Sequence, residues 1–322
     1  MKAIQFRAHG GPEVLETVEL PVPEPGPGEI LVRLEAIGVN FIDVYHRTGL
    51  YPVSLPYVPG QEGAGTVEAV GEQVSGLAAG DRVAYAGVSG AYAQYVRLPA
   101  DRAVKLPAEV DCEQAAAVML QGMTAHYLAF DTFPLKPGDT ALVQAGAGGV
   151  GLLLIQIAKR RGARVLATVG NERKAELARQ AGADEVILYS QQDFAARVKS
   201  LTGGKGVQVV YDSVGQATFL KSLDCLALRG MLVSFGQSSG RIEPFDPALL
   251  ASKGSLFLTR PTLWHYIADR PSLLRRAGDL LEWIAKGEIF LYIGKVLPLD
   301  KAADAHRLLE GRQTMGKVLL TP

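Results

Sequence analysis

Residues 141–151 have the sequence Ala141-Leu-Val-Gln-Ala-Gly-Ala-Gly-Gly-Val-Gly151, an apolar run followed at once by a glycine-rich turn. The turn matches Gly-x-Gly-x-x-Gly, a pattern that joins a strand to a helix in dinucleotide-binding units. In that setting Gly146 allows a tight turn, Gly148 lets the backbone approach a pyrophosphate, and Gly151 lets the helix pack closely on the strand. The phosphate charge then meets the free N–H groups and the positive dipole end of the helix. A glycine-rich turn without a ligand is the alternative.

The pattern on both sides of the turn favours the dinucleotide site, because strand-like and helix-like segments alternate there. The apolar runs, rich in β-branched residues, cover residues 141–145, 164–169, 185–189, 207–211, 231–235 and 255–259. Helical patterns fill four of the five gaps, at residues 151–161, 173–181, 193–201 and 218–226. Strands and crossover helices in this order are typical of a doubly wound parallel sheet. We therefore expect residues 126–261 to form such a domain.

The first third of the chain has a different pattern. Turn signals at residues 21–28, 58–60 and 79–82 separate short strand-like runs such as 30–37 and 65–70. Short strands at this spacing indicate a compact, partly open β-barrel. A helix near residues 271–286 and a closing strand at 316–320 follow the parallel-sheet pattern. We expect residues 1–125 and 262–322 to form one domain, with the parallel-sheet domain inserted in it.

Composition and charge exclude several classes of protein. The chain has 322 residues with 33 Lys+Arg and 33 Asp+Glu, and zero net charge is not the signature of a nucleic-acid or anionic-membrane binder. No run of about 18 apolar residues is present, and Arg7 and His9 stand where a signal peptide needs apolar residues. The two cysteines, Cys112 and Cys225, exclude a disulfide scaffold. We expect a soluble cytoplasmic protein that does not interact with a membrane, and the balanced charge disfavours nucleic acid as a partner.

The end of the second parallel strand indicates which dinucleotide is bound. An NAD site usually has Asp or Glu about 20 residues after the first glycine, to bind the ribose 2′-OH. Gly170 stands there instead, and Lys174 follows within one helical turn, where it can reach a 2′-phosphate. This pattern favours NADPH. In the alternative interpretation Asn171 only caps the helix, Glu172 complements its dipole and Lys174 is solvated.

A metal site is not expected, because the residues that bind metals are scattered. The five histidines show neither His-x-His nor His-x-x-x-His spacing, and neither cysteine lies near a histidine. A lone cysteine in an apolar segment is usually a small core residue.

The chain resembles the zinc-free quinone oxidoreductase (zeta-crystallin) branch of the medium-chain dehydrogenase/reductase superfamily. The resemblance runs nearly end to end and is carried by residues 10–15, 38–45, 47–49, 59–65, 147–151, 211–215 and 233–236. It implies a Rossmann-type doubly wound domain inserted into a GroES-like β-barrel-type catalytic domain. It also implies NADPH as cofactor, a quinone or related electrophile as substrate, and a homodimer paired through sheet edges.

The chain departs from the zinc alcohol dehydrogenases of that superfamily. Their Gly-His-Glu segment, whose His binds the catalytic zinc, is Gly60-Gln61-Glu62 here. Their cysteine ligand falls near Val39–Asn40, where this chain has none, and their structural-zinc lobe is missing between Tyr85 and Asp101. Oxidation of an alcohol through a zinc-polarised alkoxide is therefore not expected.

The resemblance also implies site residues. Asn40 and Tyr45 would lie by the nicotinamide and the substrate, with Gln121 and Thr124 lining the cleft between the domains. Tyr45 is also implied as a cofactor contact by the nicotinamide, and Ala147, Gly148, Gly149 and Val150 would meet the pyrophosphate, with Gly146 and Gly151 shaping the same turn. Further implied cofactor contacts are Gly170, Lys174, Tyr189 and Arg312 at the 2′-phosphate, and Gly215, Phe235, Gly236, Ser238, Leu258, Thr259 and Arg260 towards the nicotinamide.

Three functions remain open from the sequence. The first is an NADPH-dependent quinone reductase, whose conjugated acceptor needs proximity and orientation more than a metal or a strong acid. The second is a zinc-free reductase of activated C=C bonds in 2-alkenals or enoyl thioesters, with Tyr45 as a proton donor. The third, also implied by the family, is a cofactor-bound structural or RNA-binding module, which the zero net charge disfavours.

Overall fold

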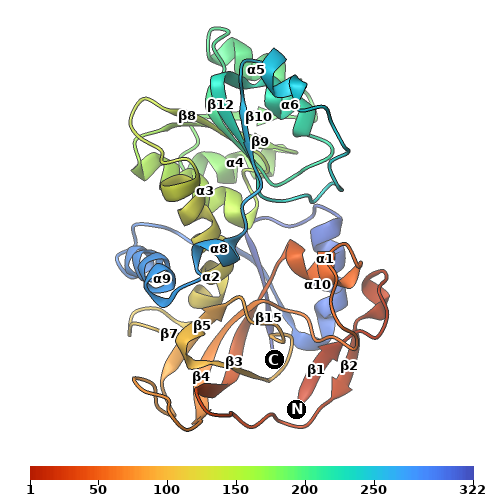
Figure 1. The fold of residues 1–322 in the computed structure, drawn as a ribbon, viewed down its shortest axis with the longest axis vertical. Helices are drawn as coiled ribbons and strands as arrows, with labels where there is room; N and C mark the ends of the chain where they lie inside the picture. Colours follow the sequence, from red (N-terminus) through yellow and green to blue (C-terminus); the bar gives the residue numbers. More distant parts are fainter. The chain divides into compact units, whose positions relative to one another are not determined.

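The computed structural model describes all 322 residues and divides into two compact units. Unit 1 comprises Met1–Met123 and Ile267–Pro322, and unit 2 comprises Thr124–Tyr266. Both ends of the chain therefore belong to unit 1 (Figure 1), and unit 2 is an insertion. The borders expected from the sequence, after residues 125 and 261, fall inside one helix and just before another. None of the helices combines the length and the apolar character needed to cross a bilayer.

Unit 2 is built on a six-stranded sheet with the order β10-β9-β8-β11-β12-β13. Every neighbouring pair in it is parallel. The strands are β8 (Thr140–Val143), β9 (Arg164–Val169), β10 (Glu185–Leu188), β11 (Val207–Asp212), β12 (Leu226–Ser234) and β13 (Phe257–Thr259). The chain starts in the middle of the sheet, winds to one edge through β9 and β10, and returns to continue beside β8. This order confirms the predicted doubly wound fold.

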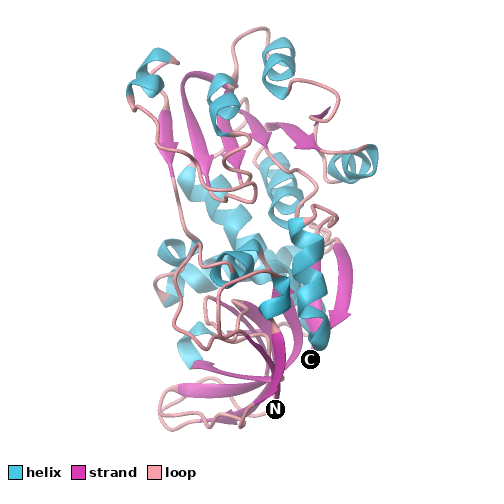
Figure 2. Cartoon of the chain, turned by 90° about the vertical axis from the view of Figure 1, so that its right-hand side faces the viewer, coloured by secondary structure: helices cyan, strands magenta, loops and turns pink.

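Helices connect the strands of unit 2 and pack against them. The helices of this unit are α3 (Gly149–Arg160), α4 (Glu172–Gln180), α5 (Phe194–Leu201), α6 (Phe219–Asp224), α7 (Ala248–Ser252) and α8 (Leu263–Tyr266). A π-helical turn is also present at Leu128–Thr132. The strands of the sheet centre are almost wholly buried, as the continuous apolar runs predict. The core includes Leu142, Leu166, Val210 and Leu232 from four neighbouring strands. Figure 2 shows the strands in magenta with helices beside them.

Unit 1 is built on a seven-stranded, mainly antiparallel sheet. Its order is β14-β15-β3-β4-β5-β7, with β6 paired to β3, and only β14 and β15 run parallel. The strands are β3 (Glu29–Val39), β4 (Glu62–Val70), β5 (Arg82–Ala86), β6 (Tyr95–Pro99), β7 (Val104–Lys105), β14 (Ile293–Pro298) and β15 (Lys317–Thr321), and β1 (Lys2–Gln5) and β2 (Glu16–Glu19) form a separate pair. The last strand of the chain, β15, thus lies beside β3, and this pairing joins the C-terminal segment to the N-terminal part of unit 1.

The helices of unit 1 complete its core. They are α1 (Phe41–Arg47), α9 (Arg270–Ala285), α10 (Ala302–Glu310) and α2 (Cys112–Tyr127), whose last turn belongs to unit 2, with single turns at Pro12–Val14, Ala100–Arg102 and Leu299–Lys301. Alternating residues of β3, such as Ile30, Val32 and Leu34, are buried in one cluster with Leu320 of β15. The alternation follows from the two-residue period of a strand. The residue directly after β3, Asn40, is polar and buried, and it forms part of the site.

Candidate functional site

The glycine-rich turn lies at the carboxyl end of β8, where its backbone folds back on itself. The N–H of Gly146 donates to the carbonyl oxygen of Thr168 at 2.9 Å, and the N–H of Gly148 donates to that of Ala145 at 2.9 Å. The left-handed residue of the turn is Ala145, with φ of +54°. The expected role of Gly146 in providing the tight turn is therefore corrected. Gly146 provides space instead, because a Cβ on it would lie 2.8 Å from the Cβ of Ala167 on β9.

The start of α3 is shaped to accept a ligand. Gly148 is its N-cap, and the first helical hydrogen bond runs from Leu152 N–H to the Gly148 carbonyl at 2.9 Å. The N–H groups of Gly149, Val150 and Gly151 therefore have no partner within the helix. A Cβ on Gly151 would lie 2.9 Å from the carbonyl carbon and oxygen of Gly146. The turn is thus a cradle that side chains would fill, with N–H groups and a positive dipole end suited to a pyrophosphate; Ala147, which is buried, is part of the same turn.

At the carboxyl end of β9, Gly170 and Tyr189 are in close contact. A Cβ on Gly170 would lie 2.7 Å from the Tyr189 hydroxyl oxygen. The hydroxyl of Ser190 donates to the Gly170 carbonyl at 3.0 Å, and Lys174 lies in the first turn of α4. The structure therefore brings Gly170, Lys174 and Tyr189 to the ends of two neighbouring strands, as a 2′-phosphate site requires.

Glu172, the acid next to this site, is held by a cation of its own helix. Its Oε1 accepts a hydrogen bond from Arg179 Nη1 at 2.8 Å, two turns further along α4. Asn171 caps the helix, since its Oδ1 accepts from the Lys174 N–H at 3.0 Å. The capping interpretation of Asn171 and the phosphate interpretation of Lys174 are therefore compatible.

The remaining residues expected at the cofactor follow β11, β12 and β13. Gly215 has a φ of +89° after β11. A Cβ on Gly236 would lie 2.6 Å from the Ser213 carbonyl oxygen, and Ser238 N–H donates to that oxygen at 3.1 Å. Because the strands are parallel, these loops lie at the same carboxyl end of the sheet as the glycine turn. Phe235 shares this loop, and Leu258, Thr259 and Arg260 occupy the neighbouring edge strand and its end.

One buried hydroxyl at this carboxyl end of the sheet has no hydrogen-bond partner. Ser234 is the last residue of β12, and its Oγ is buried without a hydrogen bond. Its carbonyl accepts a hydrogen bond from Arg260 Nη1 at 2.8 Å. A buried polar atom of this kind is costly unless a ligand satisfies it. Together with the cradle at α3, this end of the sheet fits a dinucleotide.

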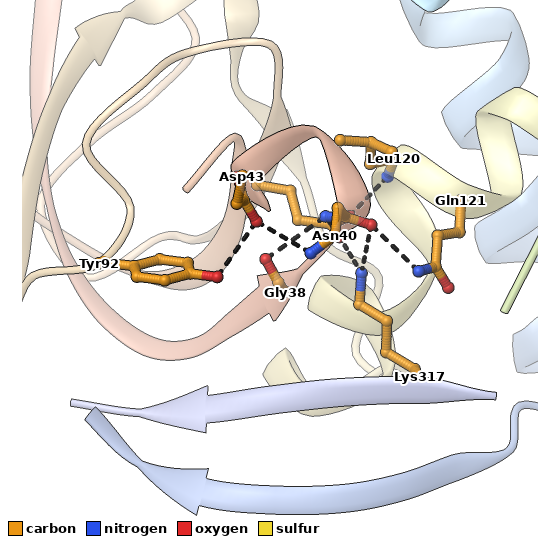
Figure 3. Close-up of polar contacts among 8 residues, drawn as sticks. Gly38, Asn40, Asp43, Tyr92, Leu120, Gln121 and Lys317 are labelled. Carbon is orange, nitrogen blue, oxygen red and sulfur yellow. Dashed lines mark hydrogen bonds and ion pairs between the residues drawn. The ribbon is translucent and has the colours of Figure 1, made fainter. Parts of the chain in front are cut away.

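Unit 1 contains a buried polar cluster around Asn40, the residue that follows β3 and caps α1. Strand register explains how its members meet. Val318 of β15 pairs with Val39, so Lys317 lies across from Asn40. Gly63 of β4 pairs with Ile37, so Glu62 lies across from Gly38. Figure 3 shows the polar contacts that result.

The Asn40 carboxamide has partners on both ends. Its Nδ2 donates to Glu62 Oε1 at 2.7 Å, and its Oδ1 accepts from Gln121 Nε2 at 3.0 Å and from Lys317 Nζ at 3.2 Å. Lys317 also forms an ion pair with Glu62, and Glu62 Oε2 accepts from the Leu120 N–H at 2.6 Å. The structure thus brings together two of the predicted residues, Asn40 and Gln121. It adds Glu62 and Lys317, which the sequence analysis did not single out as site residues.

A second chain of polar groups starts behind Asn40. Asp43 Oδ2 accepts from the Asn40 N–H at 2.9 Å and from the Tyr92 hydroxyl at 3.1 Å. Burial raises the pKa of Asp43 to about 7, against the lowering effect of these hydrogen bonds. His306 Nε2 lies 3.1 Å from the Tyr92 oxygen, and burial together with the charge of Arg47 lowers the pKa of His306 to about 3. This series of hydrogen bonds holds α1 in place.

Three predicted residues are not joined to either cluster by the contacts above. Tyr45 is buried in α1, with its ring 5.2 Å from that of Tyr51 in an edge-on arrangement. Thr124 is buried and belongs to unit 2, and Arg312 follows α10 in unit 1 with a φ of +54°. Their roles at substrate and cofactor stay predictions.

The position equivalent to the zinc-binding histidine has another role here. Gln61 Nε2 donates to Ser89 Oγ at 2.8 Å and to the Tyr57 hydroxyl oxygen at 3.1 Å. No three His, Cys, Asp or Glu side chains come together in a group that could hold a metal ion. The donor set therefore does not fit a catalytic zinc.

Comparisons with known proteins cover both units. A family model described as "Alcohol dehydrogenase GroES-like domain" matches residues 26–108, and one described as "Zinc-binding dehydrogenase" matches residues 149–273. A quinone oxidoreductase of Pseudomonas aeruginosa is 51% identical over 324 residues, covering 100% of this chain and 99% of that protein. A 2-haloacrylate reductase of a Burkholderia species is 44% identical over 321 residues, covering 97% of this chain and 96% of that protein. The crystal structure of Escherichia coli quinone oxidoreductase complexed with NADPH superposes with a TM-score of 0.98 at 47% identity, covering 100% of both chains.

Proposed function

This chain belongs to the quinone oxidoreductase branch of the medium-chain dehydrogenase/reductase superfamily, and we propose that it reduces quinones with NADPH and without a metal. The observation that carries the proposal is the cradle at the end of β8, with Lys174 and no free carboxylate at the end of β9. Such a site accepts a dinucleotide with a 2′-phosphate. The predicted family resemblance is confirmed by the identities above.

NADPH, when bound, supplies the hydride that reduces the acceptor. The N–H groups at the start of α3 hold the pyrophosphate, and Lys174, Tyr189 and Arg312 bind the 2′-phosphate beside Gly170. The loops after β11, β12 and β13 contact the nicotinamide half of the cofactor. Ser234 Oγ, buried and without a partner, gives this side a hydrogen-bonding group for the cofactor.

The acceptor is held by Asn40, Tyr45, Gln121 and Thr124. A quinone oxygen takes up negative charge that the ring delocalises, so binding and orientation contribute more than acid catalysis. The carboxamides of Asn40 and Gln121 are neutral and fixed by hydrogen bonds, which suits orientation of a neutral planar acceptor. The lack of a metal-binding group among the described side chains agrees with this chemistry.

Steady-state oxidation of NADPH with several acceptors tests the proposal. We expect turnover with 1,4-benzoquinone and 9,10-phenanthrenequinone and little with 2-hexenal. The second candidate is reduction of activated C=C bonds, which the 44% identity to a 2-haloacrylate reductase favours. Turnover of 2-hexenal or 2-chloroacrylate alone would replace the first candidate by the second.

We also propose that the chain is a cytoplasmic homodimer. Cys112 and Cys225 are both buried and unpaired, which agrees with a reducing compartment. The edge strand β13 carries Phe257, which is 56% exposed, and Leu228 of the neighbouring strand β12 is 81% exposed. Edge strands with apolar side chains pair readily with other edges. Sedimentation of the wild type as a dimer and of Phe257→Lys as a monomer would support this arrangement, and a monomeric wild type would contradict it.

A further inference from the structure

The ion pair between Lys317 and Glu62 is buried and has no obvious structural purpose. The Lys317 side chain is 3% exposed and that of Glu62 is 0% exposed. Burying two charges costs free energy that their attraction repays only partly, so a buried ion pair is weak evidence for stability. Space is nevertheless reserved for it, because Gly38 lies across from Glu62 and a Cβ there would collide with Glu62 Oε1. The pair therefore calls for a purpose other than stability.

The two charges fix the direction of the Asn40 carboxamide. A carboxylate only accepts hydrogen bonds and an ammonium group only donates them. Glu62 must therefore face Asn40 Nδ2, at 2.7 Å, and Lys317 must face Asn40 Oδ1, at 3.2 Å. The reverse orientation of the amide would set donor against donor and acceptor against acceptor.

The direction of Asn40 in turn fixes that of Gln121. Because Asn40 Oδ1 is an acceptor, Gln121 turns its Nε2 towards it, at 3.0 Å. Gln121 Oε1 then points away from Asn40, and it is buried without a hydrogen-bond partner. A buried acceptor in this state costs free energy unless a donor reaches it.

We propose that Lys317 and Glu62 are positioning residues that act through Asn40, so that Gln121 Oε1 accepts a hydrogen bond from a bound ligand. The ligand group is a neutral N–H or O–H donor. Two sources fit this chemistry, the carboxamide NH₂ of the nicotinamide and the hydroxyl of the reduced quinone. The inference rests on the proposed function, since it takes NADPH and a quinone as ligands.

The readout is discrimination between ligands that differ in one donor. NADPH has a carboxamide, whereas its 3-acetylpyridine analogue has an acetyl group without N–H. If the nicotinamide is the donor, the wild type binds NADPH about fivefold more tightly than the analogue, the value of one neutral hydrogen bond. The second arm measures the inhibition constant of 1,4-hydroquinone. General damage to the fold weakens NADPH and its analogue alike and leaves their ratio unchanged.

Two variants remove the acceptor by different routes. Gln121→Met removes Oε1 directly and leaves the ion pair in place. Glu62→Gln combined with Lys317→Met removes both charges with little change in volume, which is tolerated better than breaking the pair. In this double variant the amide introduced at position 62 keeps its oxygen on the Leu120 N–H and turns its NH₂ to Asn40. Asn40 and Gln121 then reverse, and Gln121 presents a donor to the ligand.

We expect both variants to lose the fivefold discrimination, or to raise the inhibition constant of hydroquinone about fivefold. The first result identifies the nicotinamide as the donor, and the second identifies the quinol. The matched control is Glu310→Gln, which weakens a second ion pair of unit 1, between the buried Arg47 and the partly exposed Glu310, without touching the Asn40 side chain. It is expected to keep both values.

Folded variants that bind NADPH and keep both the discrimination and the hydroquinone constant would overturn the inference. Gln121→Met decides the question for the acceptor if the double variant does not fold. A wild type that neither binds NADPH nor reduces a quinone would instead refute the proposed function.

Discussion

Replacing Gly151 by alanine adds one methyl group where α3 meets the turn after β8. Its Cβ would lie 2.9 Å from the carbonyl carbon and oxygen of Gly146, and closer still to the carbonyl oxygen of Ala145. All three are backbone atoms, which cannot turn aside as a flexible side chain does. The start of α3 must therefore move away from β8. Overpacking of this kind costs about 1–3 kcal/mol.

Gly148→Ala is the matched variant with the same added atom. Its Cβ would lie 3.2 Å from the Ala145 carbonyl oxygen, and the φ of Gly148 is −75°, which alanine adopts without strain. Loss of the glycine N-cap costs under about 1 kcal/mol. The methyl group lies on the turn that the pyrophosphate must approach, so binding suffers more than folding.

Thermal unfolding and fluorescence titration with NADPH measure the two effects separately. We expect Gly148→Ala to keep its Tm within about 2 °C and to lose at least about tenfold in NADPH affinity, the value of one charge-assisted hydrogen bond. For Gly151→Ala we expect both a Tm lowered by about 5 °C and weaker binding, because the N–H groups of α3 move. Wild-type affinity in Gly148→Ala would show that the pyrophosphate does not bind at this turn. An unchanged Tm in Gly151→Ala would refute the packing argument.

Three further predictions concern cofactor choice, pH and metal content. Lys174→Ala should weaken NADPH binding about tenfold to a hundredfold and leave NADH binding nearly unchanged, as measured by dissociation constants; equal losses for both would remove the 2′-phosphate argument. His306 has a pKa lowered to about 3 by burial and Arg47, below its unfolded value near 6.5, so it contributes stability that is lost as the pH falls from 6.5 towards 3. Urea unfolding at pH 7 and pH 4 should show that the free energy of unfolding of the wild type falls by about 3 kcal/mol more than that of His306→Gln over this interval. Identical losses would mean that His306 is protonated in the fold. Asp43, with its raised pKa, changes the stability in the opposite direction, and it does so equally in both proteins. Elemental analysis of protein purified without a metal-affinity tag should give well under one zinc per chain, and stoichiometric zinc that survives EDTA dialysis would contradict the metal-free site.

The parallel-sheet unit could be predicted from the sequence because its signals are local. Each buried strand is a continuous apolar run, and each crossover helix follows it within a few residues. The glycines of the turn mark the close approach of α3 to β8, since no other residue leaves the necessary space. The missing carboxylate at Gly170 is equally local, because the position is counted from the turn itself. The cofactor-binding half of the site could therefore be predicted from the sequence alone.

Local signals also misled at one point of the turn. The positive φ falls on Ala145, a residue with no preference for that region, while Gly146 has a different role. The surrounding hydrogen bonds, from Gly146 N–H and Gly148 N–H, hold this backbone in place. Tertiary contacts can stabilise a conformation that the residue type alone disfavours.

The polar half of the site depends on contacts between distant segments. Lys317 and Glu62 are separated by 255 positions, and they meet because β15 and β4 both pair with β3. In the sequence Lys317 is a charged residue at the start of a final strand, with nothing to indicate burial. The direction of Asn40 and the free oxygen of Gln121 follow from that pairing. The sequence by itself determined which residues repeat with strand and helix periods and where glycine makes room for a phosphate, whereas only the tertiary structure decided which buried charges share a site, because strand register is set by the packing of the whole sheet.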